Sequence, residues 1–148
     1  MKSAIVIFDT KFGNTEKIAK SLAEGMMEQG ITVDYIKVGE VDVSKLNDYD
    51  LVAIGGPTHM FGISKPIKDL LRNFEEADLK SKKAFAFDTK YKGKFIGSAG
   101  KGIEKKLKQL QMEIIKPHLS GIVKGSKGPL EEGTVEKFKQ TGADLAKE

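Results

Sequence analysis

Short apolar runs alternate with longer segments of helical periodicity along the whole chain. The first, third and fourth of these runs are apolar at nearly every position, as expected for parallel strands that are covered by helices on both faces. The predicted strands are residues 3–8, 32–38, 51–54, 84–87 and 114–123, the last of them interrupted at Pro117. This alternation is typical of βαβ units.

The segments between the runs predict four or five amphipathic helices, because their apolar residues recur three or four positions apart. Gly30 is typical of the residue that ends a helix, and Ser64 and Pro66 are typical of a helix start. The apolar residues that mark these helices are Ile18, Leu22 and Met26, then Ile67, Leu70, Leu71 and Phe74, which we expect to be buried, then Ile103, Leu107 and Leu110 on one stripe, and finally Val135, Phe138 and Leu145.

Together these elements predict one α/β domain over residues 1–148, with a doubly wound, five-stranded parallel sheet and helices on both faces. In such sheets ligands bind beyond the carboxyl ends of the strands, near the point where the strand order reverses. The segments that follow three of the predicted strands are residues 9–15, 55–63 and 88–97. We therefore expect any site to be built from these three loops.

The composition limits the chemistry that such a site can carry. The chain has no cysteine, which excludes disulfides, thiol redox chemistry and iron–sulfur clusters. Its only two histidines, His59 and His118, are far apart in sequence, so we predict no metal site. No acid/base pair or nucleophile stands out, and we predict no catalytic residue. Redox chemistry would therefore depend on a bound organic cofactor.

The charge is mildly basic, with a net +4 from 25 basic and 21 acidic residues. Lys90, Lys92 and Lys94 surround Tyr91, and we interpret this stretch as a solvated loop or a docking patch for acidic partners, not as a nucleic-acid site. No apolar run approaches the ~20 residues of a membrane helix, and the N-terminus does not resemble a signal peptide. We expect a cytoplasmic protein, monomeric and without membrane contact.

The first loop has the residues of a phosphate site. Hydroxyl and amide donors stand beside a glycine that can turn its backbone N–H groups inward, directly before a helix N-terminus that favours anions. A capped strand–helix turn is the alternative interpretation, because Asn and Thr are also common helix caps. The loop consists of Thr10, Lys11, Phe12, Gly13, Asn14 and Thr15.

Competing nucleotide motifs fail on spacing. Gly100 and Lys101 lack the glycine five residues earlier and the following Ser or Thr of a P-loop. A G-x-G-x-x-G fingerprint is absent after the first strand, where only Gly13 is present. A phospho-accepting receiver domain would have an aspartate where Gly55 and Gly56 end the third strand.

Residues 10–15, Thr-Lys-Phe-Gly-Asn-Thr, resemble the phosphate loop of the flavodoxin family, directly after the first strand as in that family. The resemblance implies a sheet order of 2-1-3-4-5 and FMN bound through hydroxyls and backbone N–H groups at this loop. Phe12 departs from the pattern, since a hydroxyl residue is frequent at its position, so one side-chain donor is missing here.

The second loop has two glycines, a proline and then large side chains, which suits a wall against a flat ligand; core packing of Met60 and Phe61 and an exposed His59 are the alternatives. In the family this loop lines the flavin ring, and its peptide flips on reduction. Gly62 or the Met60–Phe61 peptide corresponds to that hinge. The resemblance implies cofactor contacts by Pro57, Thr58, His59, Met60, Phe61 and Gly62.

The third loop, with Asp88, Thr89, Lys90 and Tyr91, resembles the D-x-x-Y stretch in which flavodoxins stack a tyrosine on the outer flavin face. Tyr91 is the candidate for stacking, and Phe95 is the alternative. An exposed surface tyrosine is the simpler interpretation. We treat Tyr35 and Tyr49 as structural, because they lie outside the three loops.

The resemblance implies an electron-transfer protein that shuttles electrons between redox partners, not an enzyme with its own substrate. Many flavodoxins are acidic, whereas this chain is basic near the expected ring, so we expect partners with acidic docking faces and a less negative second reduction potential. The alternatives are a flavodoxin-like NAD(P)H or quinone reductase, whose inserted segments are not visible here, and a flavin-free interaction domain of the same fold.

Overall fold

The sheet has the predicted doubly wound order. The computed structural model describes residues 1–93 and 96–148. The main path runs β2-β1-β3-β5-β6, with β7 beside the far end of β5, and all of these strands are parallel. Their bounds are β1 Ser3–Phe8, β2 Thr32–Lys37, β3 Leu51–His59, β5 Lys83–Tyr91, β6 Glu113–Ile114 and β7 Leu119–Val123. The short β4, Gly62–Ile63, folds back antiparallel on β3.

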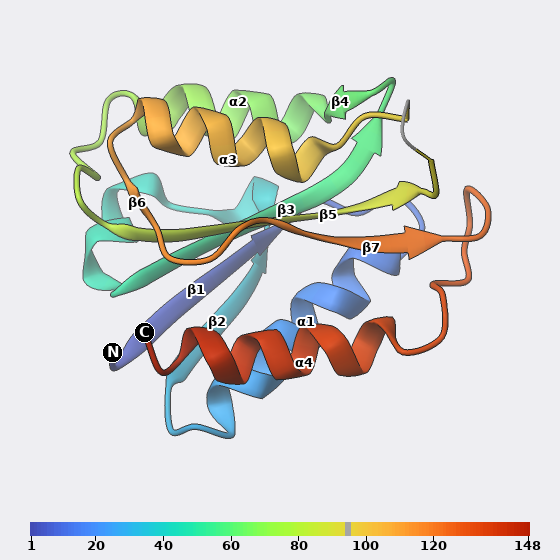
Figure 1. The fold of residues 1–148 in the computed structure, drawn as a ribbon. Helices are drawn as coiled ribbons and strands as arrows, with labels where there is room; N and C mark the ends of the chain where they lie inside the picture. The colour runs from blue at the N-terminus through green and yellow to red at the C-terminus, as the bar shows by residue number, and fades with distance from the viewer. Residues whose placement is uncertain (94–95) are drawn as a thin grey trace.

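Helices cover both faces of the sheet. The described residues form α1 Asn14–Met27, α2 Lys65–Phe74, α3 Ala99–Gln109 and α4 Thr134–Leu145, while two 3₁₀ helices, Val38–Glu40 and Val43–Asp48, connect β2 to β3. Figure 1 shows α1 and α4 on one face and α2 and α3 on the other. The doubly wound α/β prediction is therefore confirmed.

Successive side chains of each strand point to opposite faces of the sheet, so the core has two layers, one on each face. In β5, Phe85 and Phe87 pack with the α1 and α4 side chains, whereas Ala84 and Ala86 face α2 and α3. The small alanines let α3 lie close to the sheet, and the large rings fill the other layer, where Phe87 meets Phe138 edge to face at 6.0 Å. One strand thus supplies large side chains to one layer of the core and small side chains to the other.

The helices α1 and α4 touch through their backbones. A Cβ on Gly25 would lie 1.9 Å from the Lys139 carbonyl oxygen, and one on Gly142 would lie 2.1 Å from the Leu22 carbonyl oxygen. Neither approach leaves room for a side chain, so these glycines set the distance between the two helices. The position of α1 therefore depends on α4.

Two strands are longer than the sequence predicts. Residues 55–59 and 88–91, which we expected in loops, continue β3 and β5. Gly55, Gly56 and Pro57 pair in register with residues 87–89 of the neighbouring strand. Glycine, proline and aspartate usually end strands, but here the parallel pairing between two central strands overrides that local preference.

The fifth predicted strand is split, as expected at Pro117. Its first part, β6, pairs with residues 83–84 of β5, and its second part, β7, pairs with residues 87–91. The predicted count of five strands was too low, because this split and the β4 hairpin add short strands. Within residues 1–93 and 96–148, no helix is long and apolar enough to cross a membrane.

Candidate functional site

A cavity of about 570 Å³ opens at the carboxyl ends of the parallel strands. It lies where the chain leaves β1 and β3 toward opposite faces of the sheet, which is the predicted position for a ligand. Its volume falls within the range of small-molecule sites. The lining residues are Asp9, Thr10, Lys11, Phe12, Asn14 and Thr15; Pro57, Thr58, His59 and Met60; Ser64, Lys65 and Pro66; Thr89, Lys90 and Tyr91; and Val123 and Ser126.

One end of the cavity is the tight turn between β1 and α1. Gly13 has a φ of 91°, and its N–H donates to the Thr10 hydroxyl at 2.9 Å. Gly13 is also the N-cap residue of α1, and no side chain in the described structure caps this helix. The N–H groups of the first turn have no acceptors inside a helix. They are therefore available to an anion at this end of the cavity.

The same turn is tied to the sheet beneath it. Thr15 and Asn14 are both buried, and the Thr15 and Thr89 hydroxyls share a hydrogen bond at 2.9 Å. A Cβ on Gly128 would lie 2.9 Å from the Asn14 side-chain oxygen, so the segment after β7 also presses on this turn. The start of α1 is consequently fixed from two sides.

The hairpin between β3 and β4 borders the same cavity through His59 and Met60. Thr58 pairs with Ile63 and His59 with Gly62, which leaves Met60 and Phe61 as a two-residue loop. Their φ angles are 48° and 71°. Positive φ at both positions is typical of a type I′ turn, which usually has Asn or Gly there. This turn is therefore strained by its own residues.

The strained turn is supported from the α3 side. A Cβ on Gly97 would lie 2.2 Å from the Phe61 carbonyl oxygen, so the backbone of residue 97 is packed directly against the turn. A Cβ on Gly102 would lie 3.1 Å from the Ile63 side chain. The start of α3 thus fixes the hairpin from behind.

Asp88 organises the elements behind the cavity. Its carboxylate is fully buried, and one oxygen accepts hydrogen bonds from the Ser98 hydroxyl at 2.6 Å, the Gly100 N–H at 2.9 Å and the Thr58 hydroxyl at 3.1 Å. The Thr58 hydroxyl also accepts from the Ala99 N–H at 3.0 Å. The negative charge lies at the N-terminus of α3, where it is favourable. Asp88 therefore joins β3, β5 and α3.

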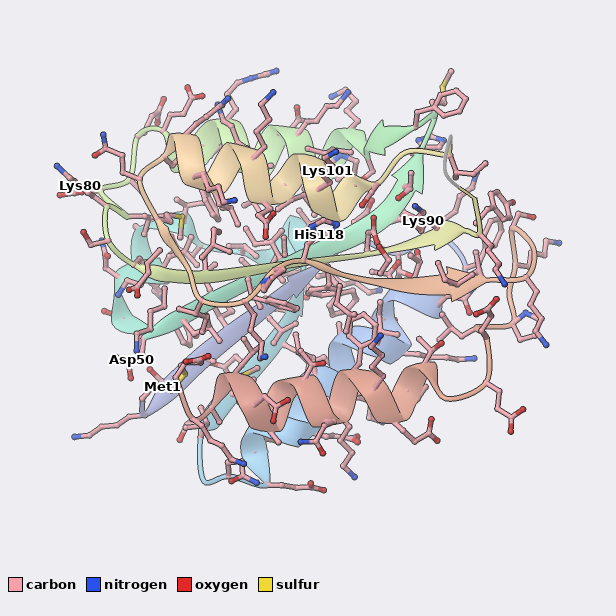
Figure 2. All side chains as sticks on the ribbon, in the orientation of Figure 1. Met1, Asp50, Lys80, Lys90, Lys101 and His118 are labelled. Atoms are coloured by element: carbon pink, nitrogen blue, oxygen red, sulfur yellow. The ribbon has the colours of Figure 1, made fainter. Side chains whose placement is uncertain are left out.

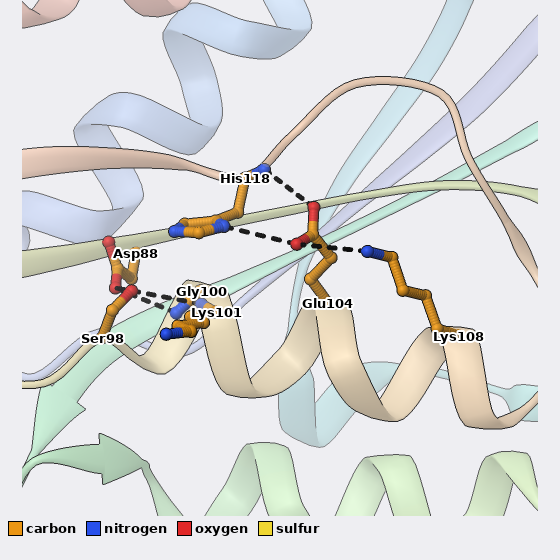
Figure 3. Close-up of polar contacts among 7 residues, drawn as sticks. All are labelled: Asp88, Ser98, Gly100, Lys101, Glu104, Lys108 and His118. Atoms are coloured by element: carbon orange, nitrogen blue, oxygen red, sulfur yellow. Dashed lines mark hydrogen bonds and ion pairs between the residues drawn. The ribbon is translucent and has the colours of Figure 1, made fainter.

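His118 lies beside this buried carboxylate. Figure 3 shows its imidazole between Asp88 and Glu104, with Nδ1 3.5 Å from a Glu104 carboxylate oxygen. The His118 backbone N–H donates to the other Glu104 oxygen at 3.0 Å. Glu104 thereby satisfies a backbone donor in the gap between β6 and β7. The second Asp88 oxygen has no hydrogen-bond partner among the described residues.

The structure brings most of the predicted site residues to one cavity. Of the predicted residues from Thr10 through Tyr91, all line it except Gly13, Phe61, Gly62 and Asp88. Gly13 and Phe61 lie in the two turns that border it, and Asp88 lies behind its wall. Tyr91 is 44% exposed at the end of β5. Phe95, the alternative to Tyr91, lies outside the described residues.

Six lining residues were missed by the sequence analysis: Asp9, Ser64, Lys65, Pro66, Val123 and Ser126. The Asp9 carboxylate accepts from the Ser64 hydroxyl at 2.7 Å, which joins β1 to the start of α2. The sequence did contain a signal for three of these residues. Ser64 and Pro66 marked the start of a predicted helix, and Val123 ended a predicted strand. Helix starts and strand ends meet at the same edge of a doubly wound sheet.

Comparisons with known proteins give one consistent result. The chain matches the family model described as Flavodoxin over residues 6–140. The probable flavodoxin 2 of Bacillus subtilis is 30% identical over 122 residues, which cover 79% of this chain and 80% of that protein. The structure of oxidised flavodoxin 1 from Bacillus cereus has a TM-score of 0.86 at 25% identity, covering 99% of this chain and 98% of the other.

Some relatives are much longer. An uncharacterized protein of Methanocaldococcus jannaschii is 30% identical over 152 residues, which cover 98% of this chain but 37% of that protein. A second uncharacterized protein of this organism is 36% identical over 59 residues, 37% of this chain and 15% of its own length. The chain therefore spans well under half the length of these two relatives.

Proposed function

Because the chain belongs to the flavodoxin family, we propose that it binds one FMN in the cavity and carries electrons between partner proteins. The observation that carries this proposal is the pairing of an uncapped α1 N-terminus at one end of the cavity with Pro57, Met60 and Tyr91 farther along it. An elongated ligand with a phosphate at one end and a flat ring at the other suits that arrangement.

The phosphate end fits a terminal phosphate monoester. The first-turn N–H groups of α1 and the hydroxyls of Thr10 and Thr15 would hold its oxygens, with Asn14 as a further amide donor. The exposed Lys11 lines the same end and adds positive charge. Phe12 would contribute its backbone N–H, as the family resemblance implies. No side chain among the described residues makes a capping hydrogen bond to this helix end, so none has to be displaced from its N–H groups.

The ring end fits a flat aromatic group. Tyr91 would stack on its outer face, and Pro57 and Met60 would form the other wall. The strained Met60–Phe61 peptide lies beside that wall and is the candidate hinge. FMN, when bound, supplies reversible one-electron and two-electron chemistry. The part of the lining side chains is to hold the ring and adjust its potential.

Positive charge near the ring should make reduction easier. Lys90 lines the cavity, and Lys92 is exposed just beyond it; Lys94, the third lysine of this prediction, lies outside the described residues. Replacing Lys90 and Lys92 by Gln should shift the second reduction potential to more negative values, measured by anaerobic potentiometry. An unchanged or less negative potential would contradict this role.

The first test compares FMN with riboflavin, which lacks the phosphate. Titration followed by flavin fluorescence and absorbance should show FMN binding at least on the order of 100-fold tighter, since the phosphate gains several charge-assisted hydrogen bonds. Thr10→Val should lower the affinity for FMN and leave that for riboflavin nearly unchanged. Equal affinity for both flavins would contradict a phosphate site at this end of the cavity. No binding of either flavin would favour an interaction domain of the same fold.

A second assay separates a carrier from an enzyme. The FMN-loaded protein is mixed with NAD(P)H and a quinone under steady-state conditions. A carrier should show turnover only when a separate reductase is added. Turnover without one would favour a flavodoxin-like quinone reductase.

A further inference from the structure

Phe61 is a large apolar side chain that the cavity does not explain. It is 71% exposed, and it is absent from the cavity lining although its neighbour Met60 is present there. Its φ of 71° adds backbone strain to the cost of an exposed aromatic ring. An exposed aromatic residue held in a costly conformation is typical of a binding anchor.

The turn that carries Phe61 is supported by packing and strand pairing around it. The backbone of residue 97 packs directly against the Phe61 carbonyl, and the first turns of α3 pack on Ile63 through Gly102. The hairpin pairing of Thr58 with Ile63 completes the support. A side chain on a hairpin that is already ordered loses less entropy on binding than one on a flexible segment, which favours its use at an interface.

Three lysines, the half-buried Lys90 and the exposed Lys92 and Lys101, contribute positive charge at this end of the molecule. Lys90 lies near the end of β5 and Lys101 lies on α3 nearer the middle of the view, both away from Met1 and Asp50 (Figure 2). Neither they nor the exposed Lys92 is paired with a carboxylate in residues 1–93 and 96–148. By contrast, the carboxylates of Asp9 and Asp88 accept internal hydrogen bonds. These three lysines therefore carry positive charge that no carboxylate among the described residues pairs with.

We propose that Phe61, Lys90, Lys92 and Lys101 form a docking surface for a protein whose electron-exchanging face has an apolar recess bordered by carboxylates. Phe61 enters the recess, and the lysines face the acidic border. The inference rests on the proposed carrier function, because it places the partner beside the ring end of the cavity. To the carrier function this inference adds an apolar anchor. Phe61 contributes most of the affinity for the partner, and the lysines make that affinity depend on the salt concentration.

The test uses two small haem proteins of opposite surface charge, acidic cytochrome b5 and basic cytochrome c. Each is titrated into the isotope-labelled protein, which is used as purified, together with any FMN that it retains. The dissociation constant is measured from NMR chemical shifts. We expect cytochrome b5 to bind more tightly, with shifts around Phe61. Tighter binding of cytochrome c, or no binding of cytochrome b5, would overturn the proposal.

Variants separate the anchor from the charges. Phe61→Asn should weaken binding of cytochrome b5 on the order of tenfold at every salt concentration. Asparagine suits the positive φ, so the turn should persist. Val135→Asn is the matched control, since Val135 is an exposed apolar residue of α4 and should have no effect. Lys90→Gln with Lys101→Gln should instead flatten the salt dependence.

Two outcomes would reject the assignment of Phe61. Unchanged binding by Phe61→Asn would show that the anchor is absent. Concentration-dependent dimerisation that Phe61→Asn abolishes would identify a second copy of the chain as the occupant. The binding readout does not require flavin reduction, so a failure of the carrier proposal in the FMN titration is distinguishable from a failure here.

Discussion

Two turns that border the cavity both have positive φ angles, but they reach them with opposite residue types. The β1–α1 turn uses Gly13, which adopts a φ of 91° without steric cost because it has no Cβ. The β3–β4 turn uses Met60 and Phe61, for which the same region is unfavourable. The backbone conformation of the first turn is set by its own residues, whereas that of the second depends on residues elsewhere in the chain.

The conformation of the β1–α1 turn is therefore determined by its local sequence, and that of the β3–β4 turn by tertiary contacts. The Met60–Phe61 turn is held by Gly97, by pairing of Thr58 with Ile63, and indirectly by Asp88, which fixes both Thr58 and the start of α3. Substitutions far from the turn in sequence should therefore disturb it most.

The largest effect is expected for Asp88→Ala. Removal of the carboxylate leaves the Ser98 and Thr58 hydroxyls and the Gly100 N–H without their acceptor in a buried site. We expect the free energy of unfolding, measured in urea, to fall by about 3 kcal/mol or more. Asp88→Asn, which keeps an oxygen acceptor, should lose less. Equal losses for the two variants would show that the hydrogen bonds do not hold this region.

Gly97→Ala should come next. The added methyl group would clash with the Phe61 backbone, and residue 97 also has a φ of 81°. The expected loss of stability is about 2 kcal/mol, with changed amide chemical shifts in the hairpin. Gly62→Ala is the control in the same hairpin, because a Cβ there meets nothing within 4 Å. A similar loss in both would contradict a specific contact between residue 97 and the turn.

Gly13→Ala should have a smaller effect of about 1 kcal/mol. Only backbone strain at φ 91° opposes the substitution, since a Cβ on this residue would meet nothing within 4 Å. Gly39→Ala, at a position with equally open space but no positive φ, should change the unfolding free energy little. A loss well above that of Gly97→Ala would reverse the ranking and make the first turn the more dependent one.

Phe61→Asn should have the smallest effect and the opposite sign. Asparagine is favoured at both positions of a type I′ turn, so stability should rise by about 0.5 kcal/mol. A stabilising substitution that weakens partner binding would show that the native residue is kept for function. Thermal unfolding of this variant beside Phe61→Leu measures the change, and a loss of stability only in the asparagine variant would reject strain at residue 61.

Much of the fold followed from sequence because its determinants are local or periodic. The helix that starts at Ser64 and the strand at residues 3–8 were predicted with their bounds nearly correct. The ends of β3 and β5 were not, because Gly55, Pro57 and Asp88 normally end strands and only the neighbouring strand keeps them paired. Pairing partners are a tertiary property that local residue preferences do not contain.

The candidate site divides in the same way. Residues 10–15 were identified from their own order, and they lie at one end of the cavity. The inward position of Asp88 was not foreseen, since the family resemblance placed it in a loop that contacts the cofactor. Its burial depends on donors from residues 58, 98 and 100, which lie 30, 10 and 12 residues away along the chain.

The backbone contact between α1 and α4 has a consequence for how the protein is made. The start of α1 forms one end of the cavity, yet its helix is positioned through Gly25 and Gly142, which lie more than a hundred residues apart. A chain still being synthesised has no α4 against which α1 can settle. During translation, the end of the cavity at the start of α1 therefore reaches its final form only after α4 has left the ribosome.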